Sequence, residues 1–409
     1  MRSSIRFSLA LAIATVLLAA PSARAADITA GEWKIGLYGF ASGYYQMGLC
    51  DDSATVVAGG ASCNTGPGGE NRSAVSNGLG VGHFGVSAST QKDGWDLGGA
   101  AEVWSGVNSQ PAKVGFGETG PSVRQSYVFF GRENLGTFKA GRIFGVFGSD
   151  AIGNDMTLSG VGSGAAGPSG AGNSTLGRIG VGYIFADFMP QLQYASPTLS
   201  GFQLVAAVIQ PWDAAPLAGV NPVILVEHSL PGFQGKATFD WTGRVAGRAW
   251  LGGWLQQSSS SNGQFAAIEK INSSALDLGV RADLAGFRLV GYLFLGDGVG
   301  IMAPMRDGVA IIDGKPAKRR SNGYYGQLTY AIDELKLGVS WGACNLDAAT
   351  NEMGADDLVA SNRSFIGGVY YTLGGVVTLA TEWTNTTAEN QAGSSVHDNS
   401  IAIGASAGF

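Results

Sequence analysis

The sequence consists largely of short segments in which apolar residues occupy every second position. In 276–284, LDLGVRADL, the apolar residues share one parity, and Asp277, Gly279, Arg281 and Asp283 share the other. A period of two is the pattern of a β-strand with one apolar face. In a soluble sandwich that face packs on a core, whereas in an outer-membrane barrel it meets lipid. The alternation alone leaves both folds open.

The spacing of the breaks between these segments favours the barrel. Seven short turns alternate with eight long stretches rich in Gly, Ser, Asn and Asp. This order predicts 16 antiparallel strands with both chain ends on the short-turn side, at 33–48, 78–90, 95–107, 122–133, 136–146, 187–196, 201–210, 233–242, 247–257, 274–284, 286–296, 322–332, 335–345, 362–373, 375–385 and 398–409. The count is even, and most lengths approach the ~10 residues that cross a bilayer at a tilt. The sequence therefore predicts an all-β fold, a transmembrane antiparallel up-and-down β-barrel.

The last segment, 399–409, alternates strictly up to a terminal phenylalanine, Phe409. Chain ends are normally frayed unless something fixes them. An open sheet edge in lipid leaves backbone groups without partners, so the last strand of a barrel must pair with the first. We therefore expect Phe409 to take part in barrel closure and assembly at the membrane interface, where aromatic residues collect.

The first residues have the features of a secretory signal. Arg2 and Arg6 precede an apolar run over 7–20, and Ala23-Arg24-Ala25 has the small-x-small form of a cleavage site. We predict a signal peptide over 1–25 and a barrel domain over 26–409. A retained membrane anchor is the alternative, although the run is shorter than the roughly 20 residues of a spanning helix.

Composition narrows the function further. Charged residues make up 14% of the chain and the net charge is −6, without a basic stripe, which argues against nucleic acid as a partner. Cys50 and Cys63 lie close together in the sequence and either form a disulfide or remain free thiols. Cys344 is expected to be a small packing residue. The spacing of Cys and His suggests no metal site and no cofactor. None of the three histidines stands in a catalytic context, so we do not expect an enzyme.

Three motifs and the terminal residue carry a resemblance to a known family. They are LYGFASG (37–43), VRQSYVFFGRENLGTFKAGR (123–142), FGSDAIGNDM (147–156) and Phe409. The chain resembles the trimeric, 16-stranded general diffusion porins of Gram-negative outer membranes. The resemblance implies a homotrimer in the cell outer membrane, in contact with lipid and lipopolysaccharide. It also implies a water-filled channel for passive diffusion of small hydrophilic solutes and ions, with a long third loop folded into the lumen.

In such porins a ladder of basic residues on the barrel wall faces acids on the third loop. The resemblance places the pore constriction at Phe40, His83, Arg124, Asp155, Ser159 and Ala195. Lys139, which shares its parity with Thr137, and Asp150, a further loop carboxylate, complete the expected constriction. Arg124 keeps the family's basic residue, and its parity with Ser126 predicts that its side chain faces the lumen. The other ladder positions hold a phenylalanine, a histidine and an alanine, so we expect a pore less strongly ion-selective than typical members.

Two further residue groups leave alternatives open. Arg142 shares its parity with Phe138 and is expected to point outward, either as a subunit contact or toward lipid headgroups. The basic run Lys318-Arg319-Arg320 either contacts lipopolysaccharide phosphates or belongs to a solvated loop. The alternative function is a substrate-selective porin for sugars or small carboxylates, toward which Phe40 at a ladder position is a hint.

Overall fold

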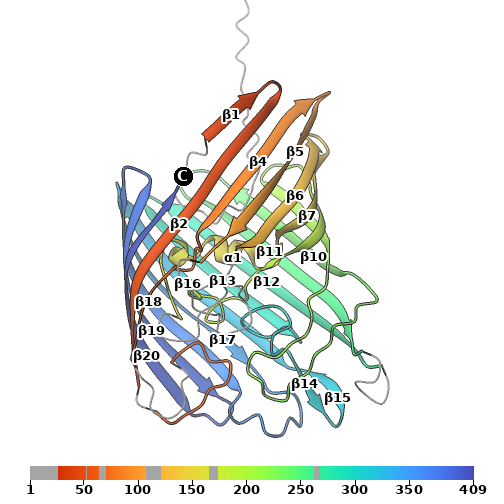
Figure 1. Cartoon of the computed structure of the whole chain (residues 1–409), viewed down its shortest axis with the longest axis vertical. Helices are drawn as coiled ribbons and strands as arrows, with labels where there is room; N and C mark the ends of the chain where they lie inside the picture. Colours follow the sequence, from red (N-terminus) through yellow and green to blue (C-terminus); the bar gives the residue numbers. More distant parts are fainter. Residues whose placement is uncertain (1–25, 52, 64–70, 107–120, 165–173, 262–267) are drawn as a thin grey trace, which may run out of the picture.

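The computed structural model describes residues 26–51, 53–63, 71–106, 121–164, 174–261 and 268–409. The predicted signal peptide, 1–25, lies outside these residues. Sixteen antiparallel strands close into a barrel (Figure 1). They are β2 (Trp33–Cys50), β4 (His83–Lys92), β5 (Trp95–Trp104), β6 (Ser122–Arg132), β7 (Gly136–Phe144), β8 (Phe188–Ala195), β9 (Phe202–Ile209), β10 (Gly232–Trp241), β11 (Ala246–Ser259), β12 (Lys270–Leu284), β13 (Phe287–Asp297), β16 (Arg320–Ile332), β17 (Leu335–Leu346), β18 (Val359–Leu373), β19 (Val377–Asn390) and β20 (Ser395–Gly408).

The pairing of β20 with β2 closes the barrel. Gly408 lies opposite Phe40, and the register continues to Asp398 opposite Cys50. One residue further on, the Gly39 and Phe409 backbones exchange two hydrogen bonds, of 2.6 and 3.0 Å between N and O. The predicted pairing of the last strand with the first is confirmed, and Phe409 is exposed on the outer surface.

The two faces of each strand differ as the alternation predicts. On β12, Leu276 and Leu278 are more than half exposed on the outer face, whereas Asp277 between them is 3% exposed inside. The outer face is therefore apolar, as a lipid-facing wall requires, and the polar parity points into the barrel. No helix among the described residues is long and apolar enough to cross a membrane.

The second barrel strand is interrupted in a way that the alternation did not predict. The extracellular half of β2 pairs with β3 (Arg72–Ser76) and its periplasmic half pairs with β4. Between them, 77–82 leaves the sheet and contacts the third loop, where the Leu79 N–H donates to the Gly160 carbonyl. A Cβ on Gly78 would lie 1.9 Å from the Gly160 oxygen, so only glycine fits there. The strand expected over 78–90 therefore begins at His83.

Three further strands lie outside the expected sixteen. β1 (Ala26–Ala30) pairs with the periplasmic end of β2. β14 (Val309–Ile312) and β15 (Lys315–Lys318) form a hairpin in the long loop between β13 and β16. Figure 1 shows this hairpin at the end of the barrel opposite β1, among the long loops.

A disulfide joins Cys50, at the end of β2, to Cys63 in the first long loop, with the Cα atoms 5.6 Å apart. Cys344 is buried and unoxidised, and its sulfur accepts a hydrogen bond from the Gly182 N–H of the third loop. The disulfide joins two residues that are 13 positions apart in the sequence, and it therefore restricts the conformations open to the unfolded chain.

We predict that the Cys50→Ser, Cys63→Ser double variant unfolds more easily than the oxidised protein. Closing a loop of this length removes unfolded-state entropy worth about 3 kcal/mol. Urea unfolding in lipid vesicles, with Cys344→Ser as the control, measures the difference. Equal midpoints for the double variant and the oxidised protein would show that the disulfide does not stabilise the barrel.

Candidate functional site

The third loop connects β7 to β8, and its described parts, 145–164 and 174–187, lie inside the barrel. It contains the short helix α1 (Ser149–Gly153) and the 3₁₀ turn η1 (Met156–Ser159). Figure 1 shows α1 within the barrel rather than above it. The loop therefore lies where the sequence placed the constriction, and the wall side chains that hold it define the candidate site.

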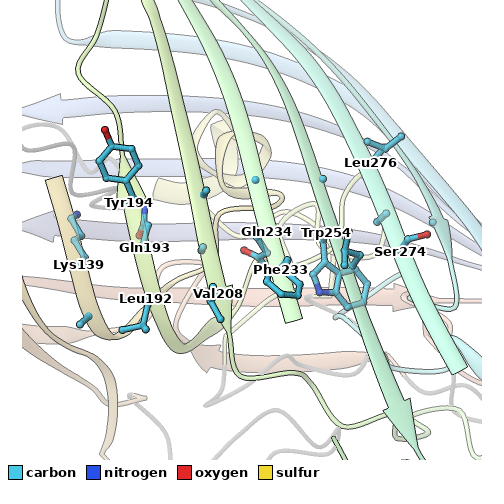
Figure 2. A pocket seen from close by; sticks show the side chains of 18 of the residues that line it. Lys139, Leu192, Gln193, Tyr194, Val208, Phe233, Gln234, Trp254, Ser274 and Leu276 are labelled. Atoms are coloured by element: carbon cyan, nitrogen blue, oxygen red, sulfur yellow. The ribbon is translucent and has the colours of Figure 1, made fainter. Parts of the chain in front are cut away.

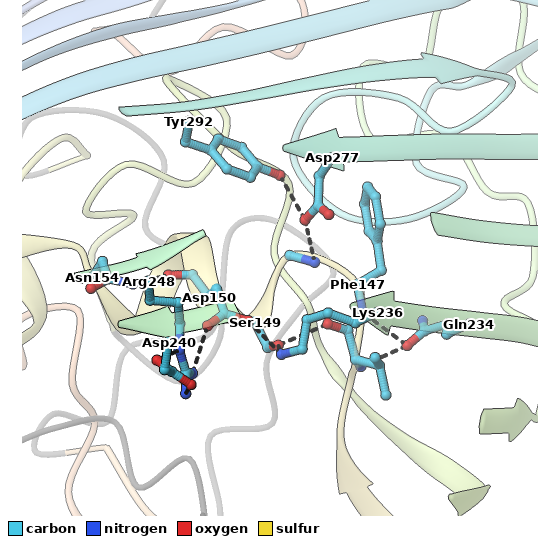
Figure 3. A network of polar contacts seen from close by, with 12 residues as sticks. Phe147, Ser149, Asp150, Asn154, Gln234, Lys236, Asp240, Arg248, Asp277 and Tyr292 are labelled. Carbon is cyan, nitrogen blue, oxygen red and sulfur yellow. Dashed lines mark hydrogen bonds and ion pairs between the residues drawn. The ribbon is translucent and has the colours of Figure 1, made fainter. Parts of the chain in front are cut away.

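Carboxylate and amide side chains of the wall hold the start of the loop. The Gln234 Oε1 of β10 accepts hydrogen bonds from the Val146 and Phe147 N–H groups at 2.6 and 3.1 Å. The Asp277 carboxylate of β12 accepts one from the Gly148 N–H at 3.0 Å. Figure 3 shows Gln234 and Asp277 on either side of this loop segment. These hydrogen bonds fix the start of the third loop against the barrel wall and satisfy its backbone N–H groups.

Asp150 on α1 lies within an ion-pair network with two wall cations (Figure 3). Its carboxylate accepts from the Lys236 ammonium and, at 3.2 Å, from the Arg248 guanidinium. Arg248 also makes two bonds to Asp240, at 2.7 and 2.8 Å. Burial alone would raise the pKa of Asp150, but the two neighbouring cations outweigh it and hold that pKa below its usual range. Asp150 is therefore an ionised anchor of the loop.

Glu382 of β19 holds the middle of the loop. Its carboxylate accepts from the Val161 and Gly162 N–H groups at 2.8 and 2.6 Å and from the Tyr370 hydroxyl at 2.5 Å. A Cβ on Gly160 would lie 1.8 Å from this carboxylate, which explains glycine at that position. The backbone of the third loop at 160–162 therefore packs directly against the Glu382 carboxylate.

Arg178 and Asp155 organise the returning part of the loop. Arg178 is fully buried and donates to the hydroxyls of Ser340 and Ser364 on β17 and β18. Burial lowers the pKa of Arg178 to about 10, so the guanidinium still carries its charge at neutral pH. The Asp155 carboxylate caps η1 by accepting a hydrogen bond from the Thr157 backbone N–H. It also accepts hydrogen bonds from the Arg178 backbone N–H and the Tyr183 hydroxyl. It is 3% exposed, so the expected constriction acid serves as a structural acceptor.

Two of the expected ladder positions, Phe40 and His83, form an aromatic row together with Trp104. Phe40 on β2, His83 on β4 and Trp104 on β5 stack side by side, with ring centroids 5.6 and 5.2 Å apart. The Arg124 guanidinium lies 5.7 Å from the centre of the Trp104 ring. The His83 Nδ1 lies 3.0 Å from the Val81 carbonyl oxygen.

Arg124 reaches this row through a β-bulge. Val103 pairs with Val123 and Glu102 pairs with Gln125, so Arg124 is an extra residue in β6. Ser126 is exposed on the outer face, and the parity argument that joined it to Arg124 was therefore wrong. The bulge turns the guanidinium inward nonetheless, because a bulge re-aims one side chain relative to its neighbours.

The remaining expected site residues lie at separate places. Lys139 is on the inner face of β7, and its ammonium lies 5.3 Å from the centre of the Tyr127 ring. The Ser159 carbonyl accepts from the Tyr44 hydroxyl at 2.8 Å. Ala195 ends β8 opposite Thr137, near the short periplasmic turn. Arg142 lies opposite Ser126, on the outer parity of β7.

The structure adds residues that sequence reasoning did not select. They are wall residues of the polar parity that touch the third loop: Gln234, Lys236, Arg248, Asp277, Gln327, Ser340, Ser364 and Glu382. The sequence alternation already places such residues on the polar face of their strands. In KATFDW (236–241), for example, Lys236 lies on the polar face. Which of them meets the loop depends on the path of the loop, for which the sequence carries no local signal.

Comparison with known proteins agrees with this geometry. A family model described as Gram-negative porin matches residues 10–391. The chain belongs to this family, and it forms an outer-membrane channel for passive diffusion. No curated protein matches the chain.

Solved structures share the fold at low sequence identity. The outer membrane channel DcaP of Acinetobacter baumannii has a TM-score of 0.68 at 16% identity, covering 93% of this chain and 99% of that chain. An anion-selective porin from Comamonas acidovorans gives 0.61 at 13%, covering 92% and 100%. OmpT of Vibrio cholerae, in its trimer form, gives 0.54 at 14%, covering 92% and 99%.

We predict that Glu382→Ala loosens the third loop. The variant leaves the Val161 and Gly162 N–H groups without their acceptor, at a cost of about 1–3 kcal/mol for each buried group. Single-channel recordings should then show added current noise and flickering between conductance levels. Glu389→Ala, which removes an exposed carboxylate from the same strand, is the matched control. Quiet, identical traces for both variants would contradict the anchoring role.

Proposed function

We propose that this channel prefers anions and that it works as a homotrimer. The observation that carries the ion preference is that three carboxylates inside the barrel are buried, whereas two lysines of the inner wall are partly exposed and have no ion-pair partner among the described residues. The inward carboxylates Glu102, Asp277 and Glu382 are only 2–3% exposed. Each accepts hydrogen bonds from the wall or the third loop. These acids are largely withdrawn from the water that a solute crosses.

The inward cations are placed differently. Lys139 on β7 and Lys336 on β17 are partly exposed on the inner face. Their ammonium groups lie 5.3 Å from the Tyr127 ring and 4.1 Å from the Tyr370 ring. Within the described residues neither lysine has an ion-pair partner, so their charges are only weakly compensated.

Exposed ion pairs on the inner wall add to this imbalance. Arg281 of β12 and Arg288 of β13 share a single carboxylate, Asp283, at 3.0 and 2.6 Å. Arg248 and Asp240 compensate each other. Two arginines that share one acid leave a net positive charge near the periplasmic end of the lumen.

A net charge has a strong effect in this setting. The apolar barrel wall has a low dielectric constant and concentrates field lines in the water-filled lumen. Positive side chains that face this water raise the local concentration of anions and lower that of cations. The Comamonas acidovorans porin of the same fold is described as anion-selective, which is in keeping with the proposal.

The thin basic ladder by itself predicts weak ion selectivity. The cations described above lie on other strands than the ladder positions, so a thin ladder does not limit the total lumen charge. A substrate-selective porin with an aromatic track is the other candidate. The aromatic row offers little for that role, because Phe40 and Trp104 are only 7% and 8% exposed and stack on either side of His83.

The homotrimer rests on the family and on one outward residue. The OmpT structure of this fold is described as a trimer form. Arg142 is a polar residue on the outer parity of β7, among apolar neighbours such as Val128 and Leu192. A subunit contact at Arg142 would supply this guanidinium with partners that hydrocarbon lacks.

We predict a chloride-over-potassium permeability ratio above one, which falls toward one in the Lys139→Gln, Lys336→Gln double variant. A unit charge at 4 Å is worth about 1 kcal/mol even in bulk water, so the expected change is roughly fivefold or less. Reversal potentials across planar bilayers in a KCl gradient measure the ratio.

The control is Lys270→Gln, because Lys270 is exposed on the outer parity of β12. A wild-type channel that prefers potassium, or a double variant that keeps the wild-type ratio, would overturn the proposed anion preference. Either outcome would leave the diffusion channel itself intact.

A further inference from the structure

Three arginines lie on neighbouring strands of the inner wall, near its periplasmic end. Arg248 of β11 pairs directly with Arg281 of β12. Arg288 of β13 pairs with Asp283, the next inward residue after Arg281. Like charges that lie directly opposite each other on one face of a sheet repel and destabilise it. The row of arginines therefore costs stability unless anions lie between the guanidinium groups.

The acids of the wall compensate this row only in part. Arg248 donates two hydrogen bonds to Asp240, which neutralises it (Figure 3). Arg281 and Arg288 share a single acid, Asp283. The Arg281 Nε lies 3.0 Å from one carboxylate oxygen, and the Arg288 Nε donates to the other at 2.6 Å. One carboxylate thus holds two guanidinium groups, and one positive charge remains.

The shared carboxylate leaves the outer ends of both guanidinium groups free. A guanidinium has five N–H donors, and Arg281 and Arg288 each contact Asp283 through Nε. Among the described residues, the Nη1 and Nη2 atoms of both arginines have no hydrogen-bond or ion-pair partner. The two side chains are 28% and 48% exposed on the inner face. Two adjacent forks of N–H donors therefore face the water of the lumen.

The outer side of the wall has a different character. Its hollow over β8 to β12 is lined largely by apolar side chains, among them Leu192, Val208, Phe233 and Leu276 (Figure 2). An anion that entered this hollow would lose its hydration and would gain few hydrogen bonds in exchange. A site for an anion thus belongs on the inner side of the wall, where the arginine pair lies.

We propose that Arg281 and Arg288 bind the phosphate ion at the periplasmic end of the lumen. Guanidinium groups bind phosphate oxygens in a bidentate manner. The four oxygens of phosphate can meet two forks at once, whereas the two oxygens of a carboxylate are taken up by one fork. Asp283 positions both guanidinium groups for this contact. The inference rests on the proposed anion preference, since phosphate must enter the lumen to reach the pair.

A bound phosphate changes how the channel conducts chloride. It neutralises the positive charge of the arginine pair and places its own negative charge in the path of other anions. Because the low-dielectric wall concentrates the field in the lumen, this charge raises the barrier to chloride. The chloride current should therefore fall, and the fall should saturate once the site is filled.

The test measures the mean current through single channels of the full-length protein at constant KCl concentration, as inorganic phosphate is added. We expect a saturable fall in wild type. The Arg281→Lys, Arg288→Lys variant keeps both charges but loses the forks, and its half-blocking phosphate concentration should be about tenfold higher. The matched control is Arg244→Gln, which removes an exposed arginine from the turn between β10 and β11 at the same end of the barrel. It should be blocked as wild type is.

Acetate is the second probe, because a carboxylate can occupy only one fork. It should block wild type about tenfold less effectively than phosphate does. Circular dichroism in detergent verifies that each variant keeps its β-sheet.

The outcomes separate this site from the ion preference, which the reversal potential reports in the same recordings. A chloride-preferring channel whose current phosphate leaves unchanged, or a lysine variant blocked as easily as wild type, would overturn the site alone. Equal block by acetate would overturn the assignment to phosphate. A channel that prefers potassium would overturn the anion preference, and with it the basis of this site.

Discussion

The absence of hydrogen-bonding partners in hydrocarbon is the constraint on which this structure depends. A sheet that crosses a membrane must pair both of its edges, because water is not present to solvate them. Here β20 pairs with β2, and the backbone bonds between Gly39 and Phe409 extend the closure to the last residue. Closure in turn divides every strand into a lipid-facing parity and an interior parity. The polar residues of the interior parity are then available to the channel.

The interior parity serves two purposes: it holds the third loop and it lines the open part of the channel. Backbone N–H groups of the third loop need acceptors inside the barrel, and Gln234, Asp277 and Glu382 supply them. Using carboxylates as acceptors buries them. Cations cannot accept from N–H groups, so Lys139 and Lys336 stay on the open part of the wall. The proposed anion preference is thus a consequence of how the loop is held.

Sequence reasoning located the barrel well, because lipid imposes a period-two pattern on every strand. The expected and observed strands agree within a few residues at most ends, as for 286–296 against Phe287–Asp297. It failed where local pairing departs from that pattern. The interruption before His83 and the bulge at Arg124 each change which side chain faces inward. Asp155 was expected at the constriction, but loop packing makes it a cap of η1. These features depend on tertiary contacts rather than on periodicity.

The central claim is a closed wall around a water-filled lumen that the third loop narrows without filling. Liposome swelling with a graded series of neutral sugars tests it most directly. Proteoliposomes should swell quickly in small sugars and more slowly as the sugar grows, since a narrowed aqueous channel sorts neutral solutes by size. Swelling no faster than that of protein-free liposomes, even with the smallest sugar, would contradict the account.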